Sequence, residues 1–476
     1  MTGFHIEHFG CRAARADGEA IGERLRALSE SRLFQSDLVV VNTCSVTAEA
    51  DRAARAFIRR AHRENPAARI VVTGCYAQRA PEEVARLEGV AAVVGNSHKA
   101  LAPEIIFDLA LGKPQPGNIP PTLVSVQSLM AGAPAHAPVW ADDKFAHTFI
   151  EDAPLALGAQ TRPNLKIQEG CGNRCTFCVI PFTRGPSKSL SRASVIGQVQ
   201  SFVATGGKEL VLSGINLGRW GRERSGSRGE TLAGLVRTIL EQTTLFRLRL
   251  SSIEPMDWDD DLIALLREFG EPQAESLSLG RNRPAGRLAR HAHLPLQSGS
   301  DAVLRRMHRR YRPWHYAEKV ARLVDAAGPD LALGADVMVG FPGETDREFE
   351  ETLAFVRALP FGYLHLFPFS PRPGTAGWAL QAKSPVPKGA IEERMAALRA
   401  LADEKARDHR GRFVGRELAA ITLRTPLPLA ARGRTAALTE NFLPIELEGS
   451  FGANELLRAT VTGLNQDGGL RACISG

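Results

Sequence analysis

Three cysteines in one short loop constrain the fold of this chain more than any other feature. The loop places Cys171, Cys175 and Cys178 four and three residues apart. Thiolates at this spacing can hold three corners of an iron–sulfur cube, whereas a 4Fe-4S cluster normally takes four protein cysteines. The loop therefore predicts a cluster with one iron left open. A structural zinc site is the alternative, but it needs a fourth ligand close by, and no further His or Cys flanks the loop.

An iron left open in such a loop suits S-adenosylmethionine (SAM), whose amino and carboxylate groups can chelate the metal. That arrangement delivers an electron to the sulfonium and produces a carbon radical. The loop directly follows residues 164–168, which read as a strand. In barrels of parallel strands the chemistry lies on the loops that follow the strands. The position of the cysteine loop agrees with this rule.

Three further cysteines follow strand-like runs in the first part of the chain. Residues 4–9, 37–42, 69–73 and 90–95 read as strands and alternate with helix-like segments such as 47–64, which predicts a parallel α/β sheet. Cys11, Cys44 and Cys75 stand where the first three strands end. Because the carboxyl ends of parallel strands form the ligand crevice of such sheets, the three cysteines can converge on a second cluster. The alternative is that they are small buried hydrophobic residues.

The order of the segments predicts an α/β chain with four parts. Residues 1–112 form the open parallel sheet, 113–156 a Pro-rich linker, 157–409 a partial (β/α)6 barrel and 410–476 a small β-barrel. The six barrel strands are two short of a complete eightfold barrel, and the lateral opening this leaves suits a macromolecular substrate. The expected barrel strands are 164–168, 209–213, 246–251, 293–297, 334–339 and 362–367, with helices at 232–242, 346–359 and 387–409.

Composition narrows the setting of the protein. The 476 residues carry a net charge of +7, which fits a polyanionic partner without proving one. Seven cysteines and no basic leader at the start argue against a disulfide framework. Thiolates that bind metal need a reducing compartment, so we expect a cytoplasmic protein. No apolar stretch approaches the length of a membrane span, so we expect no membrane partner.

Apart from the linker and one insertion at 272–290, the whole chain resembles the methylthiotransferases of the radical-SAM superfamily. The cysteine loop, with Phe177 before its last cysteine, matches the superfamily, and the runs 42–47, 73–75, 179–187, 293–300 and 339–345 resemble this family in particular. The resemblance implies that Cys11, Cys44 and Cys75 hold an auxiliary 4Fe-4S cluster. It also implies that the later three cysteines hold the SAM cluster and that the tail is a TRAM-like RNA-binding domain.

Within this family the run 42–50 is similar to the branch that acts on N6-threonylcarbamoyladenosine at tRNA position 37. The resemblance implies an enzyme that puts a methylthio group on C2 of this base. The target is an aromatic C–H bond, which no acid or base in water activates, so a radical cofactor must carry the step. Two residues depart from the family pattern, because Ala14 stands in place of the usual Asn and Asp17 in place of Glu.

Three rival functions remain open. Two are methylthiotransferases that act on isopentenyladenosine in tRNA or on an aspartate of a ribosomal protein. The third is an RNA-binding redox sensor that is not an enzyme, which the open iron of the Cys171 loop disfavours because electron transfer does not need it. The resemblance further implies tRNA as a partner, an electron donor such as a flavodoxin or ferredoxin, and a sulfur donor.

The expected SAM contacts lie at strand ends. Ser213, Gly214 and Asn216 end the second barrel strand, where the superfamily has a short Gly-containing contact to the methionine part of SAM. Gly214 can equally be an ordinary turn residue. Gln297 ends the fourth strand and can hydrogen-bond SAM or the nucleoside, although polar residues at strand ends are often structural caps.

Two basic segments are candidates for RNA contacts, because single-stranded RNA is bound by stacking and by backbone charge. Either segment can equally be a solvated surface loop. The first is 219–224 with Arg228, where cations flank Trp220, and the second is the insertion with Arg281, Arg283, Arg287, Arg290 and the following His291.

Overall fold

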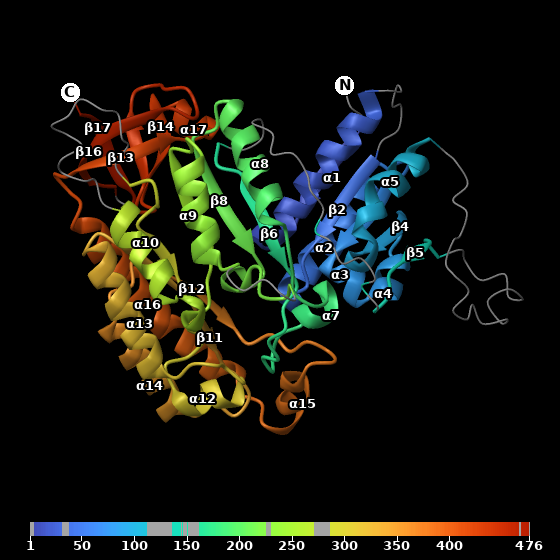
Figure 1. Ribbon diagram of the computed structural model, residues 1–476. Helices are drawn as coiled ribbons and strands as arrows, with labels where there is room; N and C mark the ends of the chain where they lie inside the picture. Colours follow the sequence, from blue (N-terminus) through green and yellow to red (C-terminus); the bar gives the residue numbers. More distant parts are fainter. Residues whose placement is uncertain are drawn as a thin grey trace, which may run out of the picture. The chain divides into compact units, whose positions relative to one another are not determined.

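The computed structural model describes residues 4–30, 38–111, 136–143, 145, 150, 161–224, 230–270, 286–465 and 468–475 (Figure 1). The packing of the chain divides it into two compact units. Unit 1 contains Met1–Pro154, Glu169–Lys188 and Ser370–Thr375, and unit 2 contains Leu155–Gln168, Ser189–Phe369 and Ala376–Gly476. All six cysteines with a predicted metal role belong to unit 1. The predicted linker 113–156 and insertion 272–290 lie largely outside the described residues.

Unit 1 contains the predicted parallel sheet. Its strands are paired in parallel in the order β1 (Phe4–His8), β2 (Leu38–Thr43), β3 (Arg69–Gly74), β4 (Val90–Gly95) and β5 (Val139–Trp140). Successive side chains of a strand point to opposite faces. Val40 packs in one core with helices α1 (Arg12–Glu30) and α5 (Ala102–Ala110), while Val41 packs in a second core with α2 (Ala48–Glu64), α3 (Cys75–Arg79) and α4 (Pro81–Ala85). Helices therefore cover both faces, which confirms the predicted fold of this part.

Local signals explain where the helices of the sheet unit begin. Thr47, predicted to open a helix, is the N-cap of α2, and its side chain accepts a hydrogen bond of 3.2 Å from the backbone N of Ala50. The helix begins immediately after the loop that carries Cys44. Cys44 is thus held between a buried strand and a capped helix.

Unit 2 contains the partial barrel. Parallel pairing joins β6 (Asn164–Glu169), β8 (Glu209–Gly214) and β9 (Arg247–Leu250), and separately β10 (His291–His293), β11 (Ala332–Val339) and β12 (Tyr363–Pro368). The short strand β7 (Lys188–Ser189) lies beside β6. Hydrogen bonds between Leu248 and residues 287 and 289 connect the two groups of strands. In the described part no pairing joins β12 back to β6 or β7, so the barrel is open, as predicted.

The fourth barrel strand differs from its prediction. We expected a strand over 293–297, but β10 covers His291–His293. Beyond His293 an isolated bridge pairs Gln297 with Val337, and Gln297 has a φ of +65°, a left-handed conformation outside the strand region. The sequence alone did not indicate this turn, because apolar residues alternate along the run 293–297 as they do in a strand.

The helices of the partial barrel follow the predicted alternation with the strands. α9 covers Leu232–Gln242, as expected, and α14 (Asp346–Ala358) begins with a capping box between Thr345 and Glu348. The other helical segments are α7 (Ile180–Arg184), α8 (Arg192–Ala204), η2 (Leu217–Arg219), η3 (Pro255–Asp257), α10 (Asp260–Gly270), α12 (Asp301–Arg306), α13 (Pro313–Ala327), α15 (Ala376–Lys383), α16 (Lys388–Gly411) and α17 (Leu427–Ala430).

The tail forms the predicted small β-barrel. Its strands close in the order β13 (Glu417–Thr422), β14 (Arg434–Thr439), β15 (Pro444–Glu448), β17 (Leu470–Ile474) and β16 (Leu456–Leu464). Inward-facing apolar residues from these strands form a separate hydrophobic core. Closure removes the exposed edges that would otherwise template aggregation.

Candidate functional site

The first cysteine triad lies at the carboxyl edge of the unit 1 sheet. Cys11, Cys44 and Cys75 follow β1, β2 and β3, as the sequence predicted. Gly10 has a φ of +103°, and a Cβ at this position would lie 2.3 Å from the Cβ of Cys44. The absence of a side chain at Gly10 thus lets the chain before Cys11 approach Cys44 closely. Two of the three cysteine loops are therefore in direct contact.

The thiol of Cys44 is strongly affected by its surroundings. Burial, together with nearby Cys75 and Cys11, raises the pKa of Cys44 to about 12, while Arg184 acts in the opposite direction. The Nδ2 of Asn96 lies 3.5 Å from the Sγ of Cys75. Because metal ligation requires a thiolate, binding of a cluster here must release the proton of Cys44.

The second triad lies on the loop between β6 and α7. Gly170, directly before Cys171, has a φ of +73°, and a Cβ there would lie 1.9 Å from the carbonyl oxygen of Pro186. Only glycine fits this close approach. The backbone N–H of Asn173 donates to the Sγ of Cys171 over 3.4 Å. N–H groups directed at cluster sulfurs are among the contacts that set cluster potentials. The three cysteines are partly exposed and thus accessible to a ligand.

A buried cluster of four charges connects the two cysteine regions within unit 1. The Nη1 of Arg184, at the end of α7, lies 2.8 Å from Asp17 in α1 and 2.8 Å from Glu169, two residues before Cys171. Lys99 also pairs with Glu169 and lies 3.4 Å from Asp17. All four side chains are at most 7% exposed. Two cations and two anions balance each other, as burial requires.

Arg184 also fits a site that holds negatively charged sulfur. Its Nε and Nη2 are buried and have no hydrogen-bond partner among the described residues. Burial lowers the pKa of Arg184, but Cys75, Asp17, Glu169 and Cys11 together raise it well above its usual value. The cation thus faces the first triad with donor groups to spare. This donor set fits a thiolate-ligated iron–sulfur cluster, which carries negative charge.

The structure shows the surroundings of Asp17 and Ala14, the two residues that depart from the family pattern. Asp17 belongs to the buried charge cluster, where its shorter side chain still reaches Arg184 and Lys99. Ala14 is fully buried, and its carbonyl oxygen accepts a hydrogen bond from the side-chain amide of Asn42. The chain thus joins the first two cysteine loops through the backbone at Ala14.

The four residues predicted to contact SAM differ in the hydrogen bonds and close contacts that they already make within the protein. The hydroxyl of Ser213 donates to the carbonyl of Leu165 over 3.3 Å, and a Cβ at Gly214 would lie 2.9 Å from that of Gln168. The backbone N of Asn216 donates to the side chain of Gln168 over 2.7 Å. Gln297 is 7% exposed, and its Oε1 has no partner among the described residues. Gln297 therefore offers a buried acceptor for a ligand.

The first basic segment is not a stacking surface. Trp220 is fully buried, and its Nε1 donates to the carbonyl of Leu190, so it cannot stack on a base. Arg224 packs on the Trp220 ring and pairs with Glu230. Arg219 and Arg222 lie 3.6 and 3.4 Å from the buried carboxylate of Asp257. Our expectation of an aromatic RNA contact here was wrong for Trp220, while Arg228 lies outside the described residues.

The described arginines of the insertion also have structural roles. Arg287 donates to the carbonyls of Leu240, Thr243 and Leu245 at the end of α9. Arg290 pairs with Glu440 of the C-terminal barrel. The buried His291 contacts the hydroxyl of Tyr363. Arg281 and Arg283 lie outside the described residues.

Sequence reasoning missed the charge cluster. Arg184 lies in a run that resembles the family, and Lys99 follows shortly after β4, at the same edge as the cysteines. The available signal was a charged residue near a strand end in an otherwise apolar setting.

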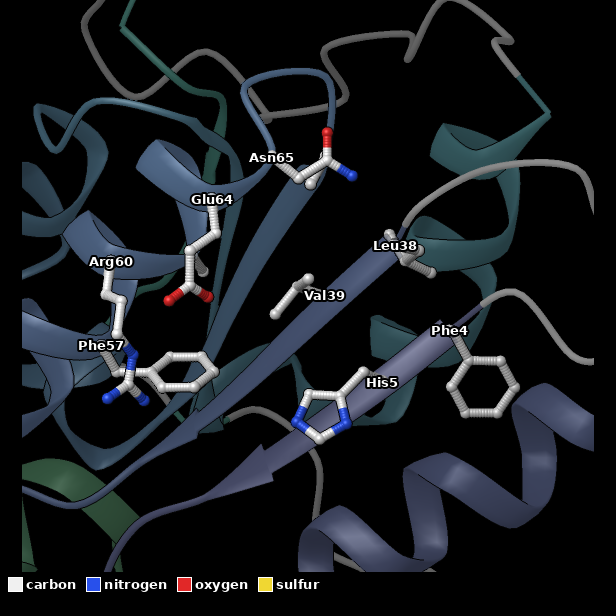
Figure 2. Close-up of a pocket in the computed structure, with 10 residues that line it drawn as sticks. Phe4, His5, Leu38, Val39, Phe57, Arg60, Glu64 and Asn65 are labelled. Carbon is white, nitrogen blue, oxygen red and sulfur yellow. The ribbon is translucent and has the colours of Figure 1, made fainter.

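Unit 1 also contains a hollow that neither the cysteines nor the charge cluster line. Figure 2 shows it around Phe4, Leu38 and Asn65, at the amino ends of β1 and β2, opposite the cysteine edge.

Comparisons with known proteins match these regions. Residues 3–95, which include the first triad, match the uncharacterized protein family UPF0004. Residues 165–356, which include the second triad, match the radical SAM superfamily. Among solved structures, the radical S-adenosylmethionine methyltransferase TsrM from Kitasatospora setae has a TM-score of 0.50 and 14% identity, covering 77% of this chain and 75% of that one. This likeness concerns the fold alone.

Relatives of nearly equal length are similar over most of the chain. The threonylcarbamoyladenosine tRNA methylthiotransferase MtaB of Bacillus subtilis is 34% identical over 94% of this chain and 90% of its own. The MtaB of Aquifex aeolicus is 31% identical over 96% and 99%. A tRNA-2-methylthio-N(6)-dimethylallyladenosine synthase of Erythrobacter litoralis is 34% identical over 89% and 86%. Within the described residues, no helix combines the length and apolarity needed to span a bilayer.

Proposed function

We propose that this chain, which belongs to the radical-SAM tRNA methylthiotransferase family, is an enzyme of the branch that acts on threonylcarbamoyladenosine. The chain is a transferase that puts a methylthio group on C2 of N6-threonylcarbamoyladenosine in tRNA. Four MtaB relatives from different bacteria support this substrate. The dimethylallyladenosine substrate is the second candidate, because relatives with that printed name are up to 34% identical.

Two 4Fe-4S clusters and SAM fit the residues of the chain. Cys11, Cys44 and Cys75 would hold one cluster. Cys171, Cys175 and Cys178 would hold the other, which binds SAM. Bound there, these groups would supply the electron, the sulfur and the methyl group for the transfer.

The residues of the chain have supporting roles in this proposal. The cation of Arg184 acts to lower the pKa of the Cys44 thiol and keeps Glu169, next to the second loop, in place. The N–H of Asn173 orients the sulfur of Cys171. At the barrel rim, Gln297 offers a buried acceptor to an amino group of SAM or of the base. Ser213, Gly214 and Asn216 shape the end of β8, with Gln168 behind them.

The observation that carries the proposal is that Arg184 pairs with Asp17, near Cys11, and with Glu169, near Cys171. One buried side chain therefore supports both cysteine loops. A redox sensor would need no such joint support, whereas sulfur transfer requires two clusters that work together.

Nucleoside analysis of tRNA tests the substrate. A strain that lacks this protein should lose 2-methylthio-N6-threonylcarbamoyladenosine by mass spectrometry and regain it with the wild-type chain but not with Cys175→Ala. Loss of the methylthio-dimethylallyl nucleoside instead would establish the second candidate. Unchanged levels of both would refute the proposed function.

The remaining partners follow from the chemistry. The reaction needs an electron donor such as a flavodoxin or ferredoxin, and a sulfur donor. The C-terminal β-barrel is proposed to bind tRNA in the manner of a TRAM domain. A cytoplasmic location is proposed because oxygen-sensitive, thiolate-ligated clusters need a reducing compartment.

A further inference from the structure

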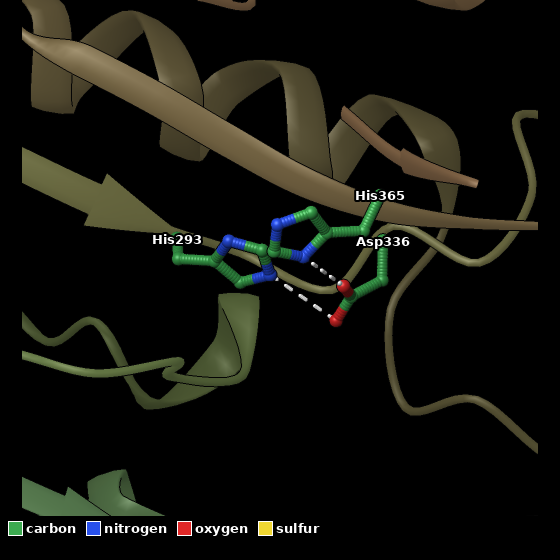
Figure 3. A group of neighbouring side chains, drawn as sticks. All are labelled: His293, Asp336 and His365. Atoms are coloured by element: carbon green, nitrogen blue, oxygen red, sulfur yellow. Dashed lines mark hydrogen bonds and ion pairs between the residues drawn. The ribbon is translucent and has the colours of Figure 1, made fainter. Parts of the chain in front are cut away.

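Three potential metal ligands come together inside unit 2. His293 ends β10, Asp336 lies in β11 and His365 lies in β12. The three strands are neighbours, and Asp336 is directly opposite His365 in the parallel register. Figure 3 shows both imidazole rings turned toward the carboxylate. The partial barrel thus presents two histidines and one aspartate to a common point.

The distances suit a single bound ion. The Nε2 of His293 lies 3.1 Å from Oδ2 of Asp336, and the Nδ1 of His365 lies 3.2 Å from Oδ1. The three ligand atoms all lie within 4.8 Å of one another. Ligands bound tetrahedrally to zinc at about 2.0–2.2 Å are separated by about 3.3–3.6 Å. Only small side-chain rotations are needed to admit the ion.

The second nitrogen of His293 also has a hydrogen-bond partner. Its Nδ1 lies 3.0 Å from the hydroxyl of Tyr363, which also lies 2.7 Å from the Nε2 of His291. A hydrogen bond to this nitrogen fixes the ring orientation and directs Nε2 toward Asp336.

We propose that His293, Asp336 and His365 bind a divalent cation, Zn²⁺ in the first place. Two imidazoles and one carboxylate form a donor set that zinc takes in open sites, where three protein ligands leave one position for a further ligand. Side-chain exposure rises from 8% at His293 to 25% at Asp336 and 61% at His365. The site is therefore reached from the His365 side.

The open position suits an anionic oxygen ligand. This step rests on the proposed function, because the threonylcarbamoyl group has a free carboxylate and the dimethylallyl group has none. A zinc ion that binds this carboxylate would favour the first substrate over the second. The metal site itself does not depend on this step.

Metal content tests the site in the full chain with both clusters assembled anaerobically. After incubation with ZnCl2 and gel filtration, the wild type should retain one zinc per chain in addition to its iron. X-ray absorption at the zinc edge should show nitrogen and oxygen neighbours near 2.0–2.1 Å rather than sulfur near 2.3 Å. His365→Ala and Asp336→Asn should weaken zinc binding at least about tenfold.

His5→Ala is a matched control. The side chain of His5 is 61% exposed, like that of His365, and its Nε2 also lies 3.2 Å from a carboxylate, that of Glu7. This variant should bind zinc like the wild type. Far-UV circular dichroism and iron content verify that His365→Ala is folded. Zinc held by sulfur, no retained zinc, or equal binding by His365→Ala would overturn the proposal in favour of a metal-free hydrogen-bond network.

A separate measurement tests the ligand. N6-threonylcarbamoyladenosine nucleoside should add an oxygen neighbour to the bound zinc and tighten its retention, whereas adenosine should not. No difference between the nucleosides would overturn the carboxylate step while leaving the metal site in place. Failure of the proposed function would appear differently, as a wild-type chain that binds zinc but makes no methylthio nucleoside.

Discussion

Removal of the charge of Arg184 tests whether the buried charge cluster stabilises unit 1. In the wild type, Arg184 and Lys99 balance Asp17 and Glu169. Arg184→Gln leaves one negative charge without compensation in a setting where the carboxylates are at most 7% exposed. Loss of one partner from a buried ion pair costs about 3–5 kcal/mol. With a urea m-value of about 2–3 kcal/mol/M, the unfolding midpoint should fall by about 1–2.5 M.

The assay is anaerobic urea unfolding followed by circular dichroism, together with iron analysis. Iron at the first triad should fall, because the cation that favours the thiolate of Cys44 is lost. Arg237→Gln is the control, since Arg237 forms exposed pairs with Glu241 and Glu268, and its removal should leave the unfolding midpoint nearly unchanged.

A second substitution separates charge from packing. Arg184→Gln combined with Asp17→Asn leaves Lys99 and Glu169 as a balanced pair. The double variant should recover about 1–3 kcal/mol relative to the sum of the single variants. If the two effects simply add, or if Arg184→Gln resembles the exposed control, then charge balance is not what holds the cluster together.

Three further predictions concern other parts of the chain. Burial alone would raise the pKa of Glu209, but three nearby cations lower it to about 2: Arg249, Arg247 and Arg162. The ionised Glu209 therefore stabilises the fold above its unfolded pKa near 4.5, and this stabilisation is lost as the pH falls toward 2. Glu209→Gln should therefore be about 3 kcal/mol less stable at pH 7, with a gap that narrows between pH 4.5 and 2 in anaerobic denaturation; a constant gap would contradict this. Gly170→Ala should lose the iron of the second triad, because its Cβ would collide with Pro186. The control Gly172→Ala should keep its iron, because there is open space around residue 172. Equal iron content in the two variants would disprove the role of Gly170. Gln297→Ala should raise the KM for SAM or for the tRNA about tenfold at unchanged iron content, and unchanged steady-state kinetics would exclude a binding role.

Much of the fold followed from local patterns along the chain. The buried strands of unit 1 and the segments of α2 and α9 appeared at the residues expected, because apolar periodicity and caps such as Thr47 are local properties. The placement of Cys11, Cys44 and Cys75 at one sheet edge also followed, since parallel strands share their carboxyl ends. The closed C-terminal barrel followed from short strands separated by Gly and Pro.

Tertiary structure alone decided which side chains meet across long stretches of sequence. Arg184 pairs with Asp17 across 167 residues, and His293, Asp336 and His365 come from three separate strands, so no local pattern connects them. The sequence determined that Trp220 is aromatic and flanked by arginines, but packing decided that its ring is buried. Likewise, the left-handed conformation of Gln297 depends on its contacts with β11. Local chemistry fixes which elements form, whereas the free energy of burying charges and rings depends on neighbours that only the folded chain supplies.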